Sequence, residues 1–294
     1  MQVLLDADIL LYEVGFGAES GWQGEGLPSF DHVANLLDER INNICVMAGA
    51  TVPPKLYLTG KGNFRYDIAK RAPYKTRAGN KPFHYYNIKA YIKSKYDWYE
   101  YYGFEADDAL RIEQTLRDKR AIEAVALGED AEPETIVCSR DKDSLNYEGW
   151  KYSWEIGAQP SFGPEKVEGF GKITLSSDNK KLRGVGEKFF YAQVLTGDVT
   201  DSIPGLPKCG PKKAFDILQA TTTPTEAFQS VLEAYRAFYG EAAEVELLEQ
   251  ARLLNMTRRF EDGKILLWTF PEVAYEEWID VNTKEITRTP SILS

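Results

Sequence analysis

The acidic residues of this sequence include four short clusters, and carboxylates are its best candidates for chemistry. The clusters comprise Asp6 and Asp8; Glu105, Asp107 and Asp108; Asp141 and Asp143; and Asp198 and Asp201. Carboxylates that share one site repel each other, so such a site needs cations. Oxygen ligands without histidine favour Mg²⁺ or Mn²⁺. Two such ions about 4 Å apart can activate water and stabilise both oxygens of an in-line displacement at phosphorus.

Other catalytic chemistries fit the composition poorly. The chain has two histidines and three widely separated cysteines, which excludes a histidine metal triad and argues against a zinc site. It has no Gly-x-Ser-x-Gly elbow for a serine nucleophile. The spacing from Gly205 to Gly210 resembles a phosphate-binding loop, but Pro211 stands where that motif needs lysine.

Strand-like and helix-like segments alternate in an order that would position the acids. Residues 3–6, 55–58 and 135–138 are apolar runs typical of buried strands, whereas 31–48 and 105–120 are expected to be helices. This alternation predicts an α/β fold with a mostly parallel, twisted sheet flanked by helices. Since the carboxyl ends of parallel strands meet at one edge of a sheet, the acids should converge there.

The second half of the chain indicates a different, mainly helical organisation. Helices are expected at 187–196, 211–219, 224–238 and 241–256.

Before this region, residues 121–134 hold five acids and no base, which predicts an exposed loop. We predict two domains, a core over 1–186 and a helical subdomain over 187–294.

A basic, aromatic-rich segment at residues 61–95 departs from the acidic character of the chain. It holds ten Lys/Arg and one acid, a net charge of +9, so that the rest of the −10 chain carries −19. Seven Phe and Tyr residues are interleaved with these charges. Cations for phosphates and rings for bases are typical of a track for single-stranded nucleic acid. A solvated basic helix with half-buried aromatics is the alternative.

Several motifs, in order, resemble those of the 5′-nuclease superfamily, which includes flap endonucleases and phage 5′→3′ exonucleases. Residues 5–8 resemble its opening strand motif, 105–108 its EADD motif and 139–143 its third acidic motif. Residues 197–205 and 210–214 resemble its signature GDxxDNIPG followed by GPKxA. The FR and YKxxR elements of its arch are matched at 64–65 and 74–77. The series covers about residues 1–220 and is most similar to podophage replication exonucleases.

The resemblance implies a PIN-like core, an arch at about 61–95 and a helix–two-turn–helix in the C-terminal subdomain. It implies two Mg²⁺ ions, for which Mn²⁺ substitutes, held by the nine clustered acids. Lys75 would place charge on the scissile phosphate, assisted by Arg71 or Arg77, and Tyr74 would either stack on a base or pack in the core. The remaining DNA contacts would come from Lys61, Arg65, Lys81, Gly205, Gly210, Lys212 and Lys213.

Two departures from the family pattern bear on these expectations. Thr59 stands where the family usually has aspartate, and a neutral hydroxyl is a poorer Mg²⁺ ligand. Asp8 is either a compensating ligand or an ordinary residue at the end of a strand. Ser202 replaces the usual asparagine of the signature.

The expected function is a metal-dependent 5′→3′ exonuclease with flap-endonuclease and RNase H-like activity. It would act on duplex DNA with a 5′ end or flap, and on RNA·DNA hybrids, and release short 5′-phosphorylated products in phage DNA replication or degradation. The protein would be a cytoplasmic monomer in a bacterial host, without a membrane partner. The alternative is a structure-specific DNA-binding module with weak or no catalysis; the length and the signature argue against an RNA-cleaving toxin of PIN type.

Overall fold

The computed structural model describes residues 1–76, 79–129 and 133–291, which form two compact units interleaved along the chain. The first unit comprises residues 1–61, 79–144 and 149–166, and the second comprises 62–78, 145–148 and 167–294. The division at residue 186 that we predict for the domains stays a prediction, because these units describe compactness and not independent folding.

A six-stranded sheet forms the centre of the first unit, with the strand order β3-β2-β1-β4-β5-β6. The strands are β1 (Gln2–Asp6), β2 (Lys55–Asn63), β3 (Asp97–Gly103), β4 (Thr135–Cys138), β5 (Gly149–Ser153) and β6 (Phe162–Val167). Strand β1 pairs in parallel with β2 and β4, and β4 pairs in parallel with β5. Leu5 lies opposite both Leu56 and Cys138, so the carboxyl ends of three strands are in register. The α/β fold with a mostly parallel sheet is confirmed.

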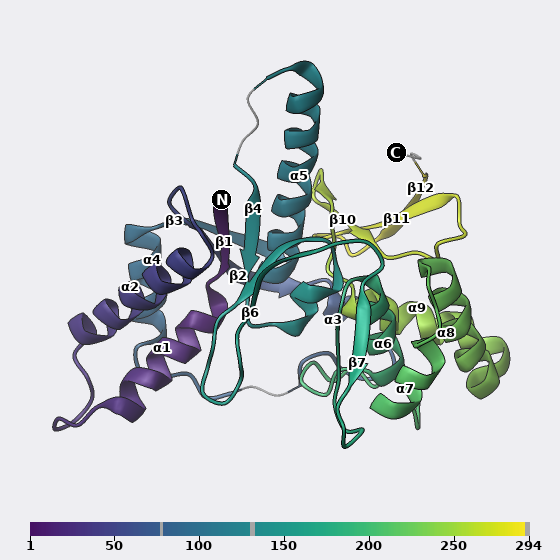
Figure 1. Ribbon diagram of the computed structural model, residues 1–294, viewed down its shortest axis with the longest axis horizontal. Coiled ribbons are helices and arrows are strands. Elements are labelled where there is room, and N and C mark those ends of the chain that lie inside the picture. The colour runs from purple at the N-terminus through teal and green to yellow at the C-terminus, as the bar shows by residue number, and fades with distance from the viewer. Residues whose placement is uncertain (77–78, 130–132, 292–294) are drawn as a thin grey trace. The chain divides into compact units, whose positions relative to one another are not determined.

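Helices cover the sheet of the first unit (Figure 1). Helices α1 (Asp8–Gly21), α2 (Phe30–Met47) and α4 (Tyr85–Lys95) pack on one another and share a core with Val3 and Leu5 of β1. Helix α5 (Ala106–Leu127) packs on β1 and β4. Val3 and Leu5 point to one face of β1 and Leu4 to the other. All three are fully buried, which is expected for a strand covered on both faces.

Helix α5 is longer than predicted. It continues to Leu127 and ends at Gly128, whose φ of +75° is the left-handed conformation of a helix C-cap. The expected loop at 121–134 is therefore wrong for its first seven residues, which are mostly alanine and other good helix formers. Leu116 of this helix is 41% exposed. Residues 130–132 lie outside the described part of the chain.

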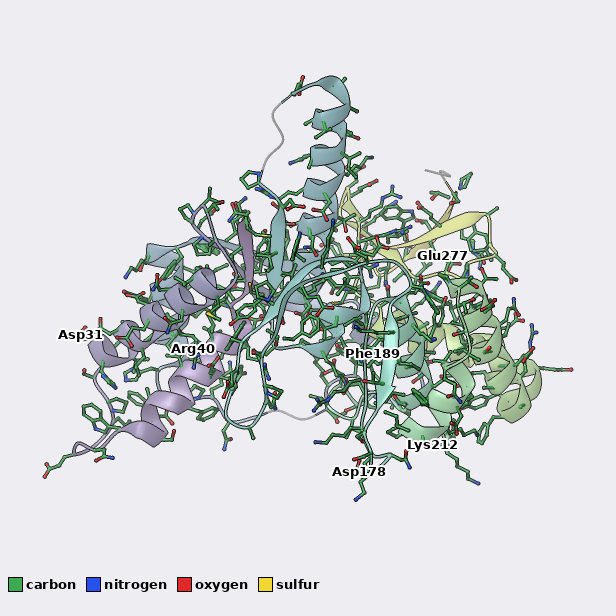
Figure 2. All side chains as sticks on the ribbon, viewed as in Figure 1. Asp31, Arg40, Asp178, Phe189, Lys212 and Glu277 are labelled. Atoms are coloured by element: carbon green, nitrogen blue, oxygen red, sulfur yellow. The ribbon has the colours of Figure 1, made fainter. Side chains whose placement is uncertain are left out.

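The second unit is built on four helices, α6 (Glu187–Thr196), α7 (Pro211–Leu218), α8 (Pro224–Tyr239) and α9 (Ala243–Leu254). Their positions confirm the four helices predicted between residues 187 and 256. Helix α6 is buried over almost its whole length, with Phe189 in the interior of the unit (Figure 2). The unit also holds the short helix α3 (Arg65–Ile68) and the hairpin of β7 (Lys172–Leu175) and β8 (Leu182–Val185).

The prediction of a helical region over 187–294 is wrong for its last part, because an antiparallel sheet follows α9. The sheet consists of β9 (Phe260–Glu261), β10 (Lys264–Leu267), β11 (Tyr275–Asp280) and β12 (Ile286–Pro290). The guanidinium of Arg252 on α9 donates to the backbone of Trp268 and pairs with Glu277 of β11. This buried pair ties the sheet to α9. None of the helices in the described residues is long and apolar enough to cross a membrane.

Candidate active site

Asp6 and Asp8 stand at the junction of β1 and α1. Asp6 is the last residue of a completely buried strand, and Asp8 is the first residue of the helix that follows. The Asp6 carboxylate accepts hydrogen bonds from the Asp8 amide at 3.1 Å and from the Ser139 hydroxyl at 2.9 Å. The junction therefore holds one carboxylate rigidly and begins a helix with the second, where negative charge is favoured.

Thr59 of β2 connects Asp8 to the start of α5. Its amide donates to both carboxylate oxygens of Asp8, at 3.1 and 3.0 Å. Its hydroxyl accepts from the Ala106 amide at 2.9 Å, and its carbonyl accepts from Lys89 at 3.2 Å. The residue that replaces the expected aspartate thus joins β1–α1, β2 and α5 through hydrogen bonds.

Glu105 and Asp108 form a capping box at the N-terminus of α5. The Asp108 side chain accepts from the Glu105 amide at 3.2 Å, and the Glu105 side chain accepts from the Asp108 amide. Asp108 is fully buried, whereas Glu105 and Asp107 are half-buried. The structure therefore gives Asp108 a capping function, and its expected metal contact stays a prediction.

The acids that follow β4 are held by a chain of local hydrogen bonds. The Ser139 hydroxyl, which donates to Asp6, accepts from the Asp141 amide at 3.0 Å. The Asp141 carboxylate accepts from the Asp143 amide at 2.8 Å, which starts the short helix η1 (Lys142–Asn146). Ser139 is the residue that places Asp141 relative to Asp6, so β1 and β4 deliver their acids to one edge of the sheet, as predicted.

Burial and mutual repulsion perturb these carboxyls. Burial, which is the largest cause, and the charges of Asp8 and Asp141 together raise the pKa of Asp6 to about 7, against the opposing hydrogen bonds from the Ser139 hydroxyl and the Asp8 amide. Burial also raises the pKa of Asp8, as does the charge of Glu105, while hydrogen bonds from Thr59 and the charge of Lys89 oppose the rise. Asp6, Asp8, Glu105 and Asp141 thus lie within electrostatic reach of one another.

The donor chemistry of this group fits a hard divalent cation. All of the candidate ligand atoms are carboxylate oxygens. A bound cation would relieve the desolvation and repulsion that raise the pKa of Asp6. Among residues 1–76, 79–129 and 133–291, however, no three Asp, Glu, His or Cys side chains are placed to hold one ion together. The acids are gathered at the strand ends without forming a ready-made cage.

Asp198 and Asp201 belong to the second unit, in the loop after α6. Asp198 and Ile203 exchange backbone hydrogen bonds at 2.8 Å, and the Asp198 carboxylate accepts from the Thr200 amide at 2.7 Å. Gly197 and Gly205 have φ of +71° and +64°, and a Cβ on either would lie 2.3 Å from the backbone of this loop. Both glycines are required for the loop to close. That these two acids share ions with those of the first unit stays a prediction.

Tyr74 and Lys75 contact Asp201 within the second unit. The Tyr74 hydroxyl donates to the Asp201 carboxylate at 3.1 Å, and the Lys75 ammonium lies 3.7 Å from it. Tyr74 is 5% exposed, and its ring packs edge-on against Tyr66. The structure therefore favours core packing over base stacking for Tyr74. The Lys75 side chain is 34% exposed, which leaves its expected phosphate contact open.

Two arginines of the expected arch have structural contacts. Arg65 is 3% exposed, and its guanidinium donates to the carbonyls of Leu253 and Asn255 at 2.9 Å. The prediction that Arg65 binds DNA is therefore wrong in this conformation, because its donors are buried on backbone acceptors. Arg71 donates to the Gly205 carbonyl at 3.0 Å and lies 3.6 Å from Glu246. Arg77 lies outside the described residues.

The remaining predicted DNA contacts lie at the surface. Gly210 caps α7, and Lys212 and Lys213 are exposed in its first turn, with Lys212 labelled in Figure 2. Lys212 pairs with Asp216 one turn along the helix, at 2.5 Å. In the first unit Lys61 is exposed, and the Lys81 ammonium lies over the rings of Tyr85 and Tyr86. These lysines are available to a polyanion, and their roles stay predictions.

Comparison with known proteins supports the architecture. No protein-family profile matches the chain. The D15 protein of bacteriophage T5, crystallised with metal ions, is 14% identical, with a TM-score of 0.50 over 87% of this chain and 89% of that chain. The T5 5′-exonuclease with bound zinc is 13% identical, with a TM-score of 0.46 over 87% and 100% of the two chains. The D15 flap endonuclease in a complex with DNA and metal ions is 12% identical, with a TM-score of 0.46 over 86% and 98%.

Identities this low establish a fold and nothing finer, and only the match at a TM-score of 0.50 carries weight. The mostly parallel central sheet flanked by helices agrees with that match. The chain therefore has the flap-endonuclease-like fold of the 5′-nucleases.

Proposed function

We propose that this protein is a divalent-metal-dependent 5′-nuclease that hydrolyses phosphodiester bonds at the 5′ ends and flaps of duplex DNA. The observation that carries the proposal is the burial of Asp6 beside Asp8 and Asp141, which raises its pKa to about 7 at the carboxyl edge of a parallel sheet. The charges of Asp8 and Asp141 both raise the pKa of the Asp6 carboxyl, so the three carboxylates repel one another within a buried site. Such a group is typical of a site for cations and phosphates.

The acids of the first unit would hold the metal. Asp6, Asp8, Glu105, Asp107 and Asp141 are the proposed ligands there, and Asp143, Asp198 and Asp201 would hold or orient a second ion. Mg²⁺, or Mn²⁺ in its place, would supply the activation of water and the neutralisation of charge at phosphorus. Ser139 and Thr59 would orient the Asp6 and Asp8 carboxylates by the hydrogen bonds described above.

The basic residues would bind the substrate. Lys75 would neutralise charge on the scissile phosphate, and Lys212 and Lys213 at the N-terminus of α7 would contact the duplex backbone without reading its sequence. The products would be short and 5′-phosphorylated, and RNA·DNA hybrids would be cleaved as well. A place in phage DNA replication or degradation follows from the motif resemblance.

A second candidate function is a structure-specific DNA-binding module with little catalysis. Two observations favour it: Thr59 stands in place of the expected aspartate, and no three acids of the described chain are placed to hold one ion. Incubation with 5′-labelled blunt, nicked and flapped duplexes, with Mg²⁺ or Mn²⁺, separates the two functions. Short labelled products support the nuclease; tight binding to DNA that stays intact at high protein concentration contradicts it.

A further inference from the structure

The segment Tyr74–Thr76 is docked on the loop that follows α6. The Lys75 amide donates to the Asp201 carbonyl at 3.0 Å. One residue further along each segment, the hydroxyls of Thr76 and Ser202 are 2.9 Å apart, and the Thr76 amide lies 3.4 Å from the Ser202 hydroxyl. The two segments belong to the same compact unit although about 126 residues separate them in sequence.

Both sides of this contact adopt an unfavourable backbone conformation. Lys75 has a φ of +48° and Ser202 a φ of +62°, in the left-handed region that residues with a Cβ rarely occupy. Such conformations persist only where the surroundings enforce them. The hydrogen bonds across Lys75–Asp201 and Thr76–Ser202 are among the contacts that hold these two residues.

The contact holds the backbone of Lys75 and leaves part of its side chain at the surface. The backbone hydrogen bond is 3.0 Å, and the ammonium lies 3.7 Å from the Asp201 carboxylate. The side chain is 34% exposed. The exposed part of the Lys75 side chain can therefore meet a phosphate oxygen while the docked backbone stays in place.

We propose that Ser202 is a positioning residue for Lys75: its hydroxyl, paired with that of Thr76, fixes the left-handed turn that presents the Lys75 ammonium to a substrate phosphate. The proposal rests on the proposed function, since it takes Lys75 as a group that contacts DNA. Ser202 itself touches no substrate. The alternative is a contact that only closes the fold of the second unit.

The first test measures whether DNA shields Lys75, without requiring cleavage. The full chain is saturated with a 5′-phosphorylated duplex in Ca²⁺ and treated with an amine-acetylating reagent, and the modification of each lysine is measured by mass spectrometry. We expect DNA to slow acetylation of Lys75 at least fivefold in the wild type and in Thr76→Ser, which keeps the hydroxyl. In Ser202→Ala and Thr76→Val we expect less than twofold protection of Lys75, with Lys213 protected as in the wild type and both variants folded at the temperature of the assay.

Wild-type protection of Lys75 in Ser202→Ala, a parallel loss at Lys213, or no protection in the wild type would each overturn the proposal. Protection of Lys75 by a protein that cuts no DNA in Mg²⁺ or Mn²⁺ would contradict the proposed function and still support the positioning role. The two failures are therefore distinguishable.

The second test is a double-mutant cycle on single-turnover cleavage in Mg²⁺. Ser202→Ala should slow cleavage about tenfold with DNA affinity within twofold of the wild type. In a Lys75→Ala background it should have no further effect, because the group that it positions is gone. Full additivity of the two substitutions would show that Ser202 acts independently of Lys75.

Discussion

The amide of Thr59 donates to both carboxylate oxygens of Asp8, and the Thr59 hydroxyl accepts from the first amide of α5, that of Ala106. A residue that looks like a lost metal ligand in the sequence is thus a bridge between two acidic clusters. The same position holds both Asp8 and the Glu105 end of α5 in place without adding a further negative charge.

Replacing Thr59 by valine should loosen this bridge. The variant keeps the branched shape but leaves the Ala106 amide without its acceptor, which costs about 1 kcal/mol of folding free energy. Urea denaturation measures the loss, and Thr59→Ser, which retains the hydroxyl, should recover most of it. Equal stability of the valine variant and the wild type would show that the bridge contributes nothing.

Replacing Asp141 by asparagine should remove most hydrolysis and leave DNA affinity within about threefold. The amide keeps the size of the side chain and its contact with the Asp143 amide but loses the charge that a divalent cation needs. Single-turnover cleavage and fluorescence anisotropy measure the two quantities on the same duplex. Unchanged cleavage would contradict the assignment of Asp141 as a metal ligand.

Arg65 and Lys61 form a matched pair that separates structure from DNA binding. Arg65→Ala should lower the free energy of unfolding by about 3 kcal/mol, because the carbonyls of Leu253 and Asn255 lose the buried guanidinium that donates to them. Lys61→Ala, at an exposed position, should leave stability unchanged and weaken DNA binding more at low salt than at high salt. Denaturation curves and salt-dependent anisotropy for both variants check this assignment; the reverse pattern would contradict it.

The contact of Asp38 on α2 with Tyr91 and Lys95 on α4 should be sensitive to acid. Burial acts to raise the pKa of Asp38, but hydrogen bonds from Lys95, Tyr96 and Tyr91 outweigh it, and the pKa falls below the ordinary 3.8. A lowered pKa stabilises the folded state above the unfolded-state value, and this contribution is lost as the pH falls below about 3.8. Asp38→Asn should therefore cost about 1 kcal/mol at pH 7 and less at pH 3, by urea denaturation. An equal cost at both pH values would contradict the assignment.

The fold, and the position of the first-unit acids at the ends of strands, could be predicted because both follow from local sequence patterns. An apolar run that ends in an acid, as at Asp6, indicates a buried strand and places the acid at the carboxyl edge of the sheet. The C-terminal sheet could not be predicted, because its short strands lack a clear alternation and depend on partners such as Arg252 and Glu277.

The burial and the hydrogen-bond partners of each candidate residue could not be predicted from the sequence. Tyr74 and Arg65 occur in a basic, aromatic-rich segment typical of nucleic-acid contacts, yet both are buried against distant residues. The positions of Ser139, two residues before Asp141, and of Ser202, directly after Asp201, indicate that both serines lie close to candidate acids. Their hydrogen-bond partners, however, are set by tertiary contacts that no spacing reveals.

We expect the carboxylates of the first unit to bind divalent cations. A crystal structure of the protein grown with Mn²⁺ tests it directly through the anomalous signal of the metal. We expect a peak about 2.2 Å from carboxylate oxygens of Asp6 and Asp141, with Asp8 or Glu105 drawn toward it. A map with strong manganese peaks elsewhere and none among these four acids would contradict it.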